Sequence, residues 1–237
     1  MNLSPIYNVF NSLPSEHLQI SVLSILISLF IVSIHNRLKN NQFSKYFDYL
    51  LLVPILIEII YFIMCMWDGV WSINNSLPFE FSYITSLSAS VYFFKRTRFL
   101  LSVLYFAGLW SSFAAFLNTN LLGNEPWYLL LKYYGHHGLT LYYGISCYIL
   151  GFRPNLNDYY NAIKYTLTVI ASVALFNIIF GSNYMFTQSK PGGVNLSQIM
   201  PEWPFYLLII ILMGLTFYSL ILLIGIKPKI NDSNLEN

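Results

Sequence analysis

Long apolar segments separated by short polar ones constrain this chain more than any other feature. Only 9% of its 237 residues are charged and 56% are hydrophobic, whereas soluble domains carry roughly 25% charged residues. A helix of about 20 apolar residues is long enough to cross the hydrocarbon core of a bilayer. The sequence therefore predicts an all-α, polytopic membrane helix bundle, with residues 1–237 in a single integral membrane domain.

Seven segments have the length and hydrophobicity of membrane spans. Pro54 is expected to kink the second of them, because proline removes a helical hydrogen bond. Residues 1–15 are mixed and polar and predict a short tail or interfacial turn, and residues 181–202 form the longest loop. The predicted spans are Leu18–Ile34, Tyr46–Met66, Leu77–Phe94, Phe99–Leu117, Trp127–Leu150, Asn161–Phe180 and Trp203–Ile226.

The distribution of basic residues predicts the orientation of these spans. Lysine and arginine concentrate in cytoplasmic loops of membrane proteins. With the N-terminus outside and the C-terminus in the cytoplasm, ten of the twelve basic residues lie inside, and only Lys132 and Lys190 lie on the outer side. The ten inner residues are Arg37, Lys39, Lys45, Lys95, Arg96, Arg98, Arg153, Lys164, Lys227 and Lys229.

Two adjacent histidines, His136 and His137, lie inside the fifth predicted span. They are about nine residues from its start, roughly 14 Å deep at 1.5 Å per residue. Ionisable groups at that depth are costly and usually mark a functional site. Gly135 and Gly138 flank them and allow another backbone or a ligand to approach closely. The alternative is that both histidines only hold the bundle together through bonds between helices.

Other polar residues are predicted to lie in the same outer half of the membrane, where a polar cavity open to the outer face would explain them. A carboxylate–imidazole pair is expected between Glu58 and one of the two histidines, either as part of the site or as a structural ion pair. Lys132, His136, Thr140 and Tyr143 share one helical face, and Ser82, Thr85, Ser86 and Ala89 form a small polar stripe that also suits helix packing. The residues assigned to the cavity are Glu58, Glu80, Ser82, His136, His137, Asn177, Asn183 and Tyr184.

Several functional classes find no support in the sequence. No nucleotide-binding glycine motif, His-Glu-x-x-His or Cys-x-x-Cys is present, so no cofactor is predicted, and the spacing of the histidines and glutamates does not favour a metal site. A net charge of +2 does not indicate a nucleic-acid partner. Cys65 and Cys147 are expected in opposite membrane halves, too far apart for a disulfide. The oligomeric state is left open.

Three motifs resemble the YwaF-like bacterial integral membrane proteins, a family similar to the animal transmembrane protein 164 acyltransferases and, more remotely, to the androgen-induced-type membrane hydrolases. The first is Trp67-Asp68-Gly69 followed by Leu77-Pro78-Phe79-Glu80-Phe81-Ser82. The second is His137-Gly138. The third, and most specific, is Gly181-Ser182-Asn183-Tyr184-Met185-Phe186, followed by Lys190-Pro191 and Trp203-Pro204. The likeness extends from about the second span to the seventh.

The resemblance implies a catalytic pair formed by a membrane-embedded cysteine and a histidine. The cysteine position is Ser82 in this chain, the histidine position is His137, and Glu80 stands where the family usually has another histidine. A serine hydroxyl can be acylated, but it needs stronger help from a general base than a thiol does. The substitution therefore favours hydrolysis or loss of activity over acyl transfer.

The leading hypothesis is a lipid acyltransferase or hydrolase in the plasma membrane of a bacterial cell, acting on a membrane lipid or acyl-chain substrate in the outer leaflet. Ser82 would be the nucleophile and His137 the general base, with Glu58 or Glu80 orienting the histidine. Asn177 or Asn183 would hold the acyl oxygen. The alternative is a non-catalytic binder or small transporter of a lipid or amphiphile. A hydrogen bond between Ser82 and His137 would favour the enzyme.

Overall fold

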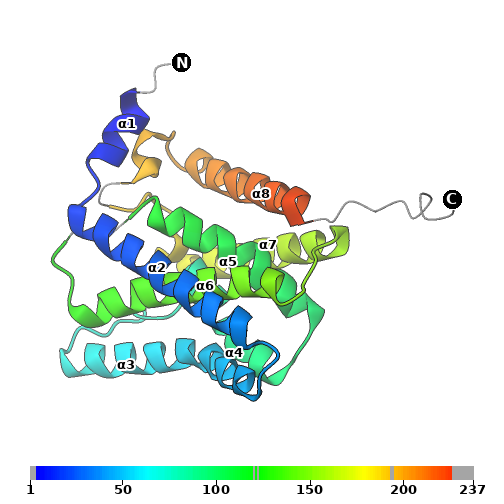
Figure 1. Cartoon of the computed structure of the whole chain (residues 1–237). Helices are drawn as coiled ribbons and strands as arrows, with labels where there is room; N and C mark the ends of the chain where they lie inside the picture. The colour runs from blue at the N-terminus through cyan, green and yellow to red at the C-terminus, as the bar shows by residue number, and fades with distance from the viewer. Residues whose placement is uncertain (1–3, 120, 122, 193–194, 226–237) are drawn as a thin grey trace, which may run out of the picture.

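The fold is a bundle of helices, as the apolar segments predict (Figure 1). The computed structural model describes residues 4–119, 121, 123–192 and 195–225, and within these ranges it contains α-helices and short 3-10 helices and no strand. The α-helices are α1 (Ser4–Asn11), α2 (Ser15–Leu38), α3 (Val53–Trp67), α4 (Phe81–Phe94), α5 (Arg98–Phe116), α6 (Trp127–Ile149), α7 (Leu156–Phe180) and α8 (Phe205–Gly225). The 3-10 helices are η1 (Gln42–Leu52), η2 (Tyr184–Phe186) and η3 (Leu196–Ile199).

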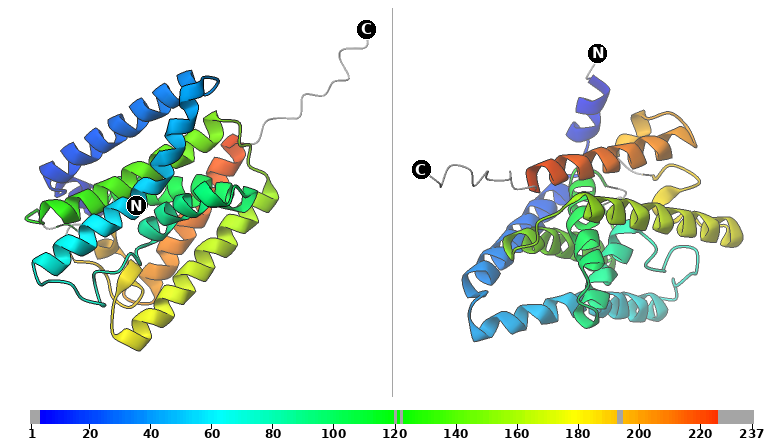
Figure 2. Two further views of the ribbon diagram at one scale, coloured as in Figure 1. Left: turned by 90° about the horizontal axis from the view of Figure 1, so that it is seen from below. Right: turned by 90° about the vertical axis from the view of Figure 1, so that its right-hand side faces the viewer.

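Helix α6 forms the centre of one half of the bundle. It packs against α2, α3, α4 and α5, while α7 and α8 pack on the other side of α5 (Figures 1 and 2). Two glycines of α6 bring its neighbours close, because a Cβ at Gly135 would lie 2.9 Å from Ile57 Cδ1 and one at Gly138 would lie 3.4 Å from Ser28 Oγ. The glycines beside the two histidines therefore serve helix packing.

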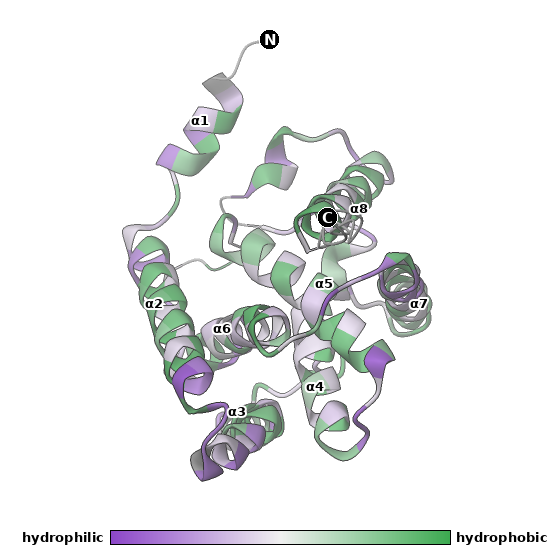
Figure 3. Cartoon of the chain, turned by 45° about the vertical axis from the view of Figure 1, so that its right-hand side comes forward, coloured by the Kyte–Doolittle hydropathy of each residue, from purple (hydrophilic) through white to green (hydrophobic). Residues whose placement is uncertain are grey.

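Hydrophobic residues predominate along the ribbons of α2 and α8, whereas α6 has paler, less hydrophobic stretches (Figure 3). Exposed examples are Phe30 on α2, Ile178 on α7 and Ile224 on α8. Such exposure suits contact with lipid and is unusual for a soluble surface. Five described segments are long and apolar enough to cross a membrane: 15–38, 44–67, 98–116, 156–180 and 205–225.

The structure has a helix at each of the seven predicted spans, but α4 and α6 differ from the other five. Helix α4 has only 14 residues, and α6 has 23 residues that include several buried tyrosines, two buried histidines and one buried lysine. A helix surrounded by protein can carry such groups because they find partners there and do not face lipid. The number of membrane crossings remains a prediction.

The predicted start of the third span at Leu77 is wrong, because α4 begins at Phe81. Pro78 explains the difference: it lacks an N–H and restricts the preceding residue to extended conformations. The Leu77 N–H donates a hydrogen bond to Tyr184 Oη at 2.9 Å instead of entering a helix. As a result, Ser82 lies in the first turn of α4.

Three other local features show how the sequence sets the ends of helices. Residues 4–11, predicted as part of a tail, form α1. Pro54 lies in the first turn of α3, where its missing N–H costs no hydrogen bond, and the chain before it is the 3-10 helix η1. Asn155 and Asp158 form a capping box that starts α7 at Leu156, five residues before the predicted span. Lys227 and Lys229, two of the ten basic residues predicted to lie inside, are outside the described residues.

Candidate functional site

A buried charge cluster occupies the side of α6 that faces α3. Glu58 Oε2 lies 3.0 Å from Lys132 Nζ, and Glu58 Oε1 lies 2.9 Å from His136 Nε2. The Lys132 side chain is only 2% exposed, and its ammonium also lies 3.8 Å from the centre of the Tyr61 ring. The carboxylate thus compensates the lysine charge within a few ångströms, which is what allows both groups to be buried.

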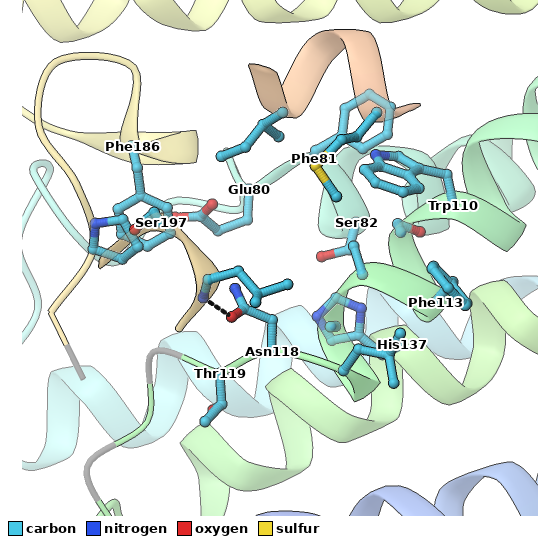
Figure 4. Close-up of a pocket in the computed structure, with 18 of the residues that line it drawn as sticks. Glu80, Phe81, Ser82, Trp110, Phe113, Asn118, Thr119, His137, Phe186 and Ser197 are labelled. Atoms are coloured by element: carbon cyan, nitrogen blue, oxygen red, sulfur yellow. Dashed lines mark hydrogen bonds between the residues drawn. The ribbon is translucent and has the colours of Figure 1, made fainter. Parts of the chain in front are cut away.

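His137, one residue further along α6, faces a cavity of about 470 Å³. Ser82 of α4, Trp110 and Asn118 near the end of α5, and Phe186 of the loop before α8 line the same cavity. Figure 4 shows the Ser82 hydroxyl and the His137 ring facing one another from two helices. The lining is mostly apolar, so the two residues form a small polar spot in a space suited to a hydrocarbon chain.

Ser82 and His137 are both buried, but no hydrogen bond joins them. Ser82 is 5% exposed and His137 is 6% exposed. Nδ1 of His137 is buried without a hydrogen bond to any described residue. The rings of Tyr133 and Phe116 lie edge-on to the imidazole, with centroids at 4.7 and 6.2 Å. Aromatic packing therefore holds the His137 ring in place, whereas the Glu58 carboxylate lies beside His136.

Glu80 also lines the cavity and connects it to the loop before α8. It directly precedes α4, and its Oε2 accepts a hydrogen bond from the backbone N–H of Met185 at 3.0 Å. Met185 and Phe186 have positive φ angles of 54° and 53°, which non-glycine residues rarely adopt. The Glu80 carboxylate helps hold this unusual turn, which directs Phe186 toward the cavity.

The three remaining predicted residues shape the same loop and do not line the cavity. Asn177 donates to Tyr184 O and to Thr187 Oγ1, both at 2.8 Å, and its Oδ1 accepts from Ser182 Oγ at 2.7 Å. Asn183 donates to Ser189 O at 2.9 Å, and Tyr184 Oη donates to Ile73 O at 2.8 Å. These groups already have partners, so they build the wall that carries Phe186.

The structure thus divides the predicted site into three parts. Glu58, Lys132 and His136 form the charge cluster, Ser82, Glu80 and His137 meet at the cavity, and Asn177, Asn183 and Tyr184 hold the loop. The other residues of the two predicted polar faces serve packing: Thr140 Oγ1 lies 2.8 Å from Ser112 Oγ, Tyr143 donates to Leu50 O, and Thr85, Ser86 and Ala89 are fully buried.

Asn118 and Trp110 line the cavity without having been predicted. Asn118 Oδ1 accepts a hydrogen bond from Leu196 N at 2.6 Å, and no hydrogen bond to a described residue is made by its Nδ2. Asn118 begins a polar loop in the sequence and Trp110 lies in an apolar run, so nothing in the pattern distinguished either. Within the described residues, no group of three or more His, Cys, Asp or Glu could hold a metal ion.

The exposed apolar helices and the buried polar interior together define a multi-pass helical membrane protein. The model of the TMEM164 family matches residues 12–222 of the chain. The match covers most of the 237 residues, so the chain belongs to the TMEM164 family. No curated protein and no solved structure matches it.

Proposed function

We propose that this protein is a membrane-embedded acyltransferase or hydrolase that acts on a lipid ester. The observation that carries the proposal is that two buried side chains, Ser82 and His137, line one mostly apolar cavity. The cavity has room for an acyl chain and presents a hydroxyl and an imidazole to its carbonyl. Within the family, the motif from Gly181 to Phe186 supports a bacterial YwaF-like member.

In the proposed mechanism, Ser82 Oγ attacks the ester carbonyl while His137 accepts the hydroxyl proton. The bond to the alcohol then breaks, and His137 returns the proton to that alcohol. Water, or a second alcohol, attacks the acyl–Ser82 ester and frees the acyl group, again with His137 as the base. The Asn118 amide lies at the same cavity and takes the role of holding the carbonyl oxygen, because the amides of Asn177 and Asn183 bond to the loop.

The second candidate is a lipid binder or small transporter without catalysis. Two observations favour it. Ser82 and His137 are not hydrogen-bonded to each other, and the Glu58 carboxylate that could orient an imidazole lies beside His136 instead. In this case the cavity holds an amphiphile whose polar end lies near Glu80 and Ser82. The two candidates differ in whether a covalent acyl–serine forms.

Labelling with an alkyl fluorophosphonate tests the enzyme directly, because the reagent bonds covalently to an activated serine. We expect Ser82→Ala to abolish labelling and turnover of a lipid ester, and His137→Ala to slow both by about 10²- to 10⁴-fold, the usual contribution of a general base. Ser86→Ala is the matched control, since Ser86 is a buried serine one turn further along α4 that does not line the cavity.

The control should label like the wild type, and His136→Ala should keep much of the activity. Labelling that survives Ser82→Ala, or equal loss from both histidine variants, would contradict the Ser82–His137 pair and favour the binder.

We further propose seven membrane crossings in the plasma membrane, with the N-terminus outside and the cavity at the outer end. Contacts support one basic end of the bundle: Arg96 pairs with Asp48 at 3.1 Å and Arg98 with Asp158 at 2.6 Å. Asp48 lies in η1 after α2, Arg96 and Arg98 lie at the turn between α4 and α5, and Asp158 lies in the first turn of α7. Lysine and arginine concentrate at this end of the bundle. A membrane-impermeant thiol reagent on intact cells should label Asn75→Cys and not Lys39→Cys. The reverse pattern would invert the proposed orientation.

A further inference from the structure

A second cavity adjoins the first on the far side of Trp110. It has a volume of about 200 Å³ and lies among α5, α7, α8 and the turn at Met185 and Phe186. Both cavities are lined by Glu80, Phe81, Trp110, Phe186 and Ile210. The side chains of Trp110 and Phe186 therefore belong to the wall between the two spaces.

The second cavity extends deeper into the bundle than the first. From Ile210, which lines both spaces, to Tyr218 at the far end of the second is about 12 Å along α8 at 1.5 Å per residue. The hydroxyls of Tyr218 and Thr166 lie 2.9 Å apart there and satisfy one another. Most of the remaining wall is aliphatic and includes Ile170, Leu207, Ile211 and Leu215.

Trp110 is held in its place by close packing. Gly214 of α8 lies against it, and a Cβ at that position would approach Trp110 Nε1 to 3.1 Å. The rings of Phe217 and Phe113 lie beside it, with centroids at 5.5 and 6.3 Å. A side chain held in this way can set a length limit, whereas a freely rotating one could not.

We infer that the second cavity receives the far end of a single alkyl chain and that Trp110 determines which chain lengths are bound. The inference rests on the proposed function, which places the chain's carbonyl beside Ser82 at the outer end. A short chain ends before Trp110, whereas a long chain passes its edge toward Tyr218. The occupant is an alkyl chain because the deep wall is aliphatic, its two hydroxyls are already paired, and the surrounding helices have exposed apolar faces suited to lipid.

Photo-cross-linking tests this with the full-length protein in lipid nanodiscs. The probes are octanoic and palmitic acids that carry a diazirine near the methyl end, and mass spectrometry locates the adducts. We expect the palmitic probe to label Ile170 and Leu215, and the octanoic probe to label residues 113–118. Adducts of the palmitic probe only on outward residues such as Ile178 and Ile224, which are 71% and 77% exposed, would overturn the inference.

Two variants make the test specific. Trp110→Ala should raise the preference for palmitic over octanoic acid by about tenfold, the effect of burying roughly two further CH₂ groups. Ile170→Phe should reduce palmitic labelling of the second cavity and leave octanoic labelling unchanged. Phe99→Ala is the control, because Phe99 is an exposed aromatic side chain on the same helix that lines neither cavity. An unchanged preference in both Trp110→Ala and Ile170→Phe would overturn the role of Trp110.

These experiments test chain binding and catalysis independently of one another. Ser82→Ala should leave cross-linking intact because no covalent chemistry at the serine is needed. Cross-linking in the second cavity without Ser82-dependent turnover would refute the enzyme and keep the chain site. Turnover that depends on Ser82 but leaves no adducts in the second cavity would refute the chain site alone.

Discussion

His136 and His137 are neighbours in the sequence, but their side chains lie in two different environments. His136 faces α3, where its Nε2 lies 2.9 Å from Glu58 and the same carboxylate pairs with Lys132. His137 faces a cavity, with aromatic rings beside it and its buried Nδ1 without a hydrogen bond to a described residue. Successive positions on an α-helix point about 100° apart, which is enough to separate the two.

The difference indicates which of the two regions is structural. Opposite charges that are buried together compensate one another, and removing one of them leaves the other unpaired in a low-dielectric interior. A buried polar group with no protein partner contributes little to stability, so a ligand or a reaction is a better reason for its presence. Mutations in the charge cluster should therefore lower the stability of the protein, whereas mutations at the cavity should lower its activity.

The largest effect on stability is expected for Lys132→Ala. The substitution leaves the Glu58 carboxylate, 15% exposed, without its ammonium partner, and breaking a buried pair in this way costs about 3–5 kcal/mol. Unfolding by denaturing detergent in mixed micelles measures the change. Arg96→Ala is the control, because Arg96 and Asp48 are 42% and 48% exposed and such pairs contribute at most about 1 kcal/mol. Similar losses in both variants would remove the distinction between the buried cluster and an ordinary surface pair.

An intermediate effect, of opposite sign at the two histidines, is expected for replacement by leucine. His136→Leu should destabilise by about 1–3 kcal/mol, because Glu58 Oε1 loses the imidazole beside it. His137→Leu should leave stability unchanged or raise it by up to about 1 kcal/mol, because an apolar side chain replaces a buried nitrogen without a hydrogen bond to any described residue. Activity should be lost in the second variant and not in the first. Equal destabilisation by the two leucines would show that His137 also has a structural role.

The sequence predicts the helices well because each depends on local information. Uninterrupted apolar runs locate the long helices, and proline or a capping residue sets several starts, as Pro54 and Asn155 show. The start of α4 also depends on local sequence, because Pro78 disfavours a helix at Leu77.

Contacts between distant segments could not be predicted in the same way. Which histidine meets Glu58 depends on how α3 and α4 pack around α6, and the sequence left both histidines open as partners. Asn177 looks like a functional asparagine until the backbone groups it bonds are known. Ser82 and His137 were assigned together through a family resemblance, and their common cavity depends on a loop far along the chain that contributes Phe186.

The smallest effect is expected at two serines that differ only in whether they have partners. Ser112 Oγ lies 2.9 Å from both Gly108 O and His137 O, which can share its one proton, and 2.8 Å from Thr140 Oγ1. Ser112→Ala should therefore cost about 1 kcal/mol. Ser86 Oγ is buried without a hydrogen-bond partner among the described residues. Ser86→Ala removes that desolvated hydroxyl at no loss of contact and should change stability by less than about 1 kcal/mol, in the stabilising direction. Unfolding of the two variants in denaturing detergent, measured in parallel, compares their stabilities. A larger loss of stability from Ser86→Ala than from Ser112→Ala would mean that the Ser86 hydroxyl has a partner in the membrane-embedded protein.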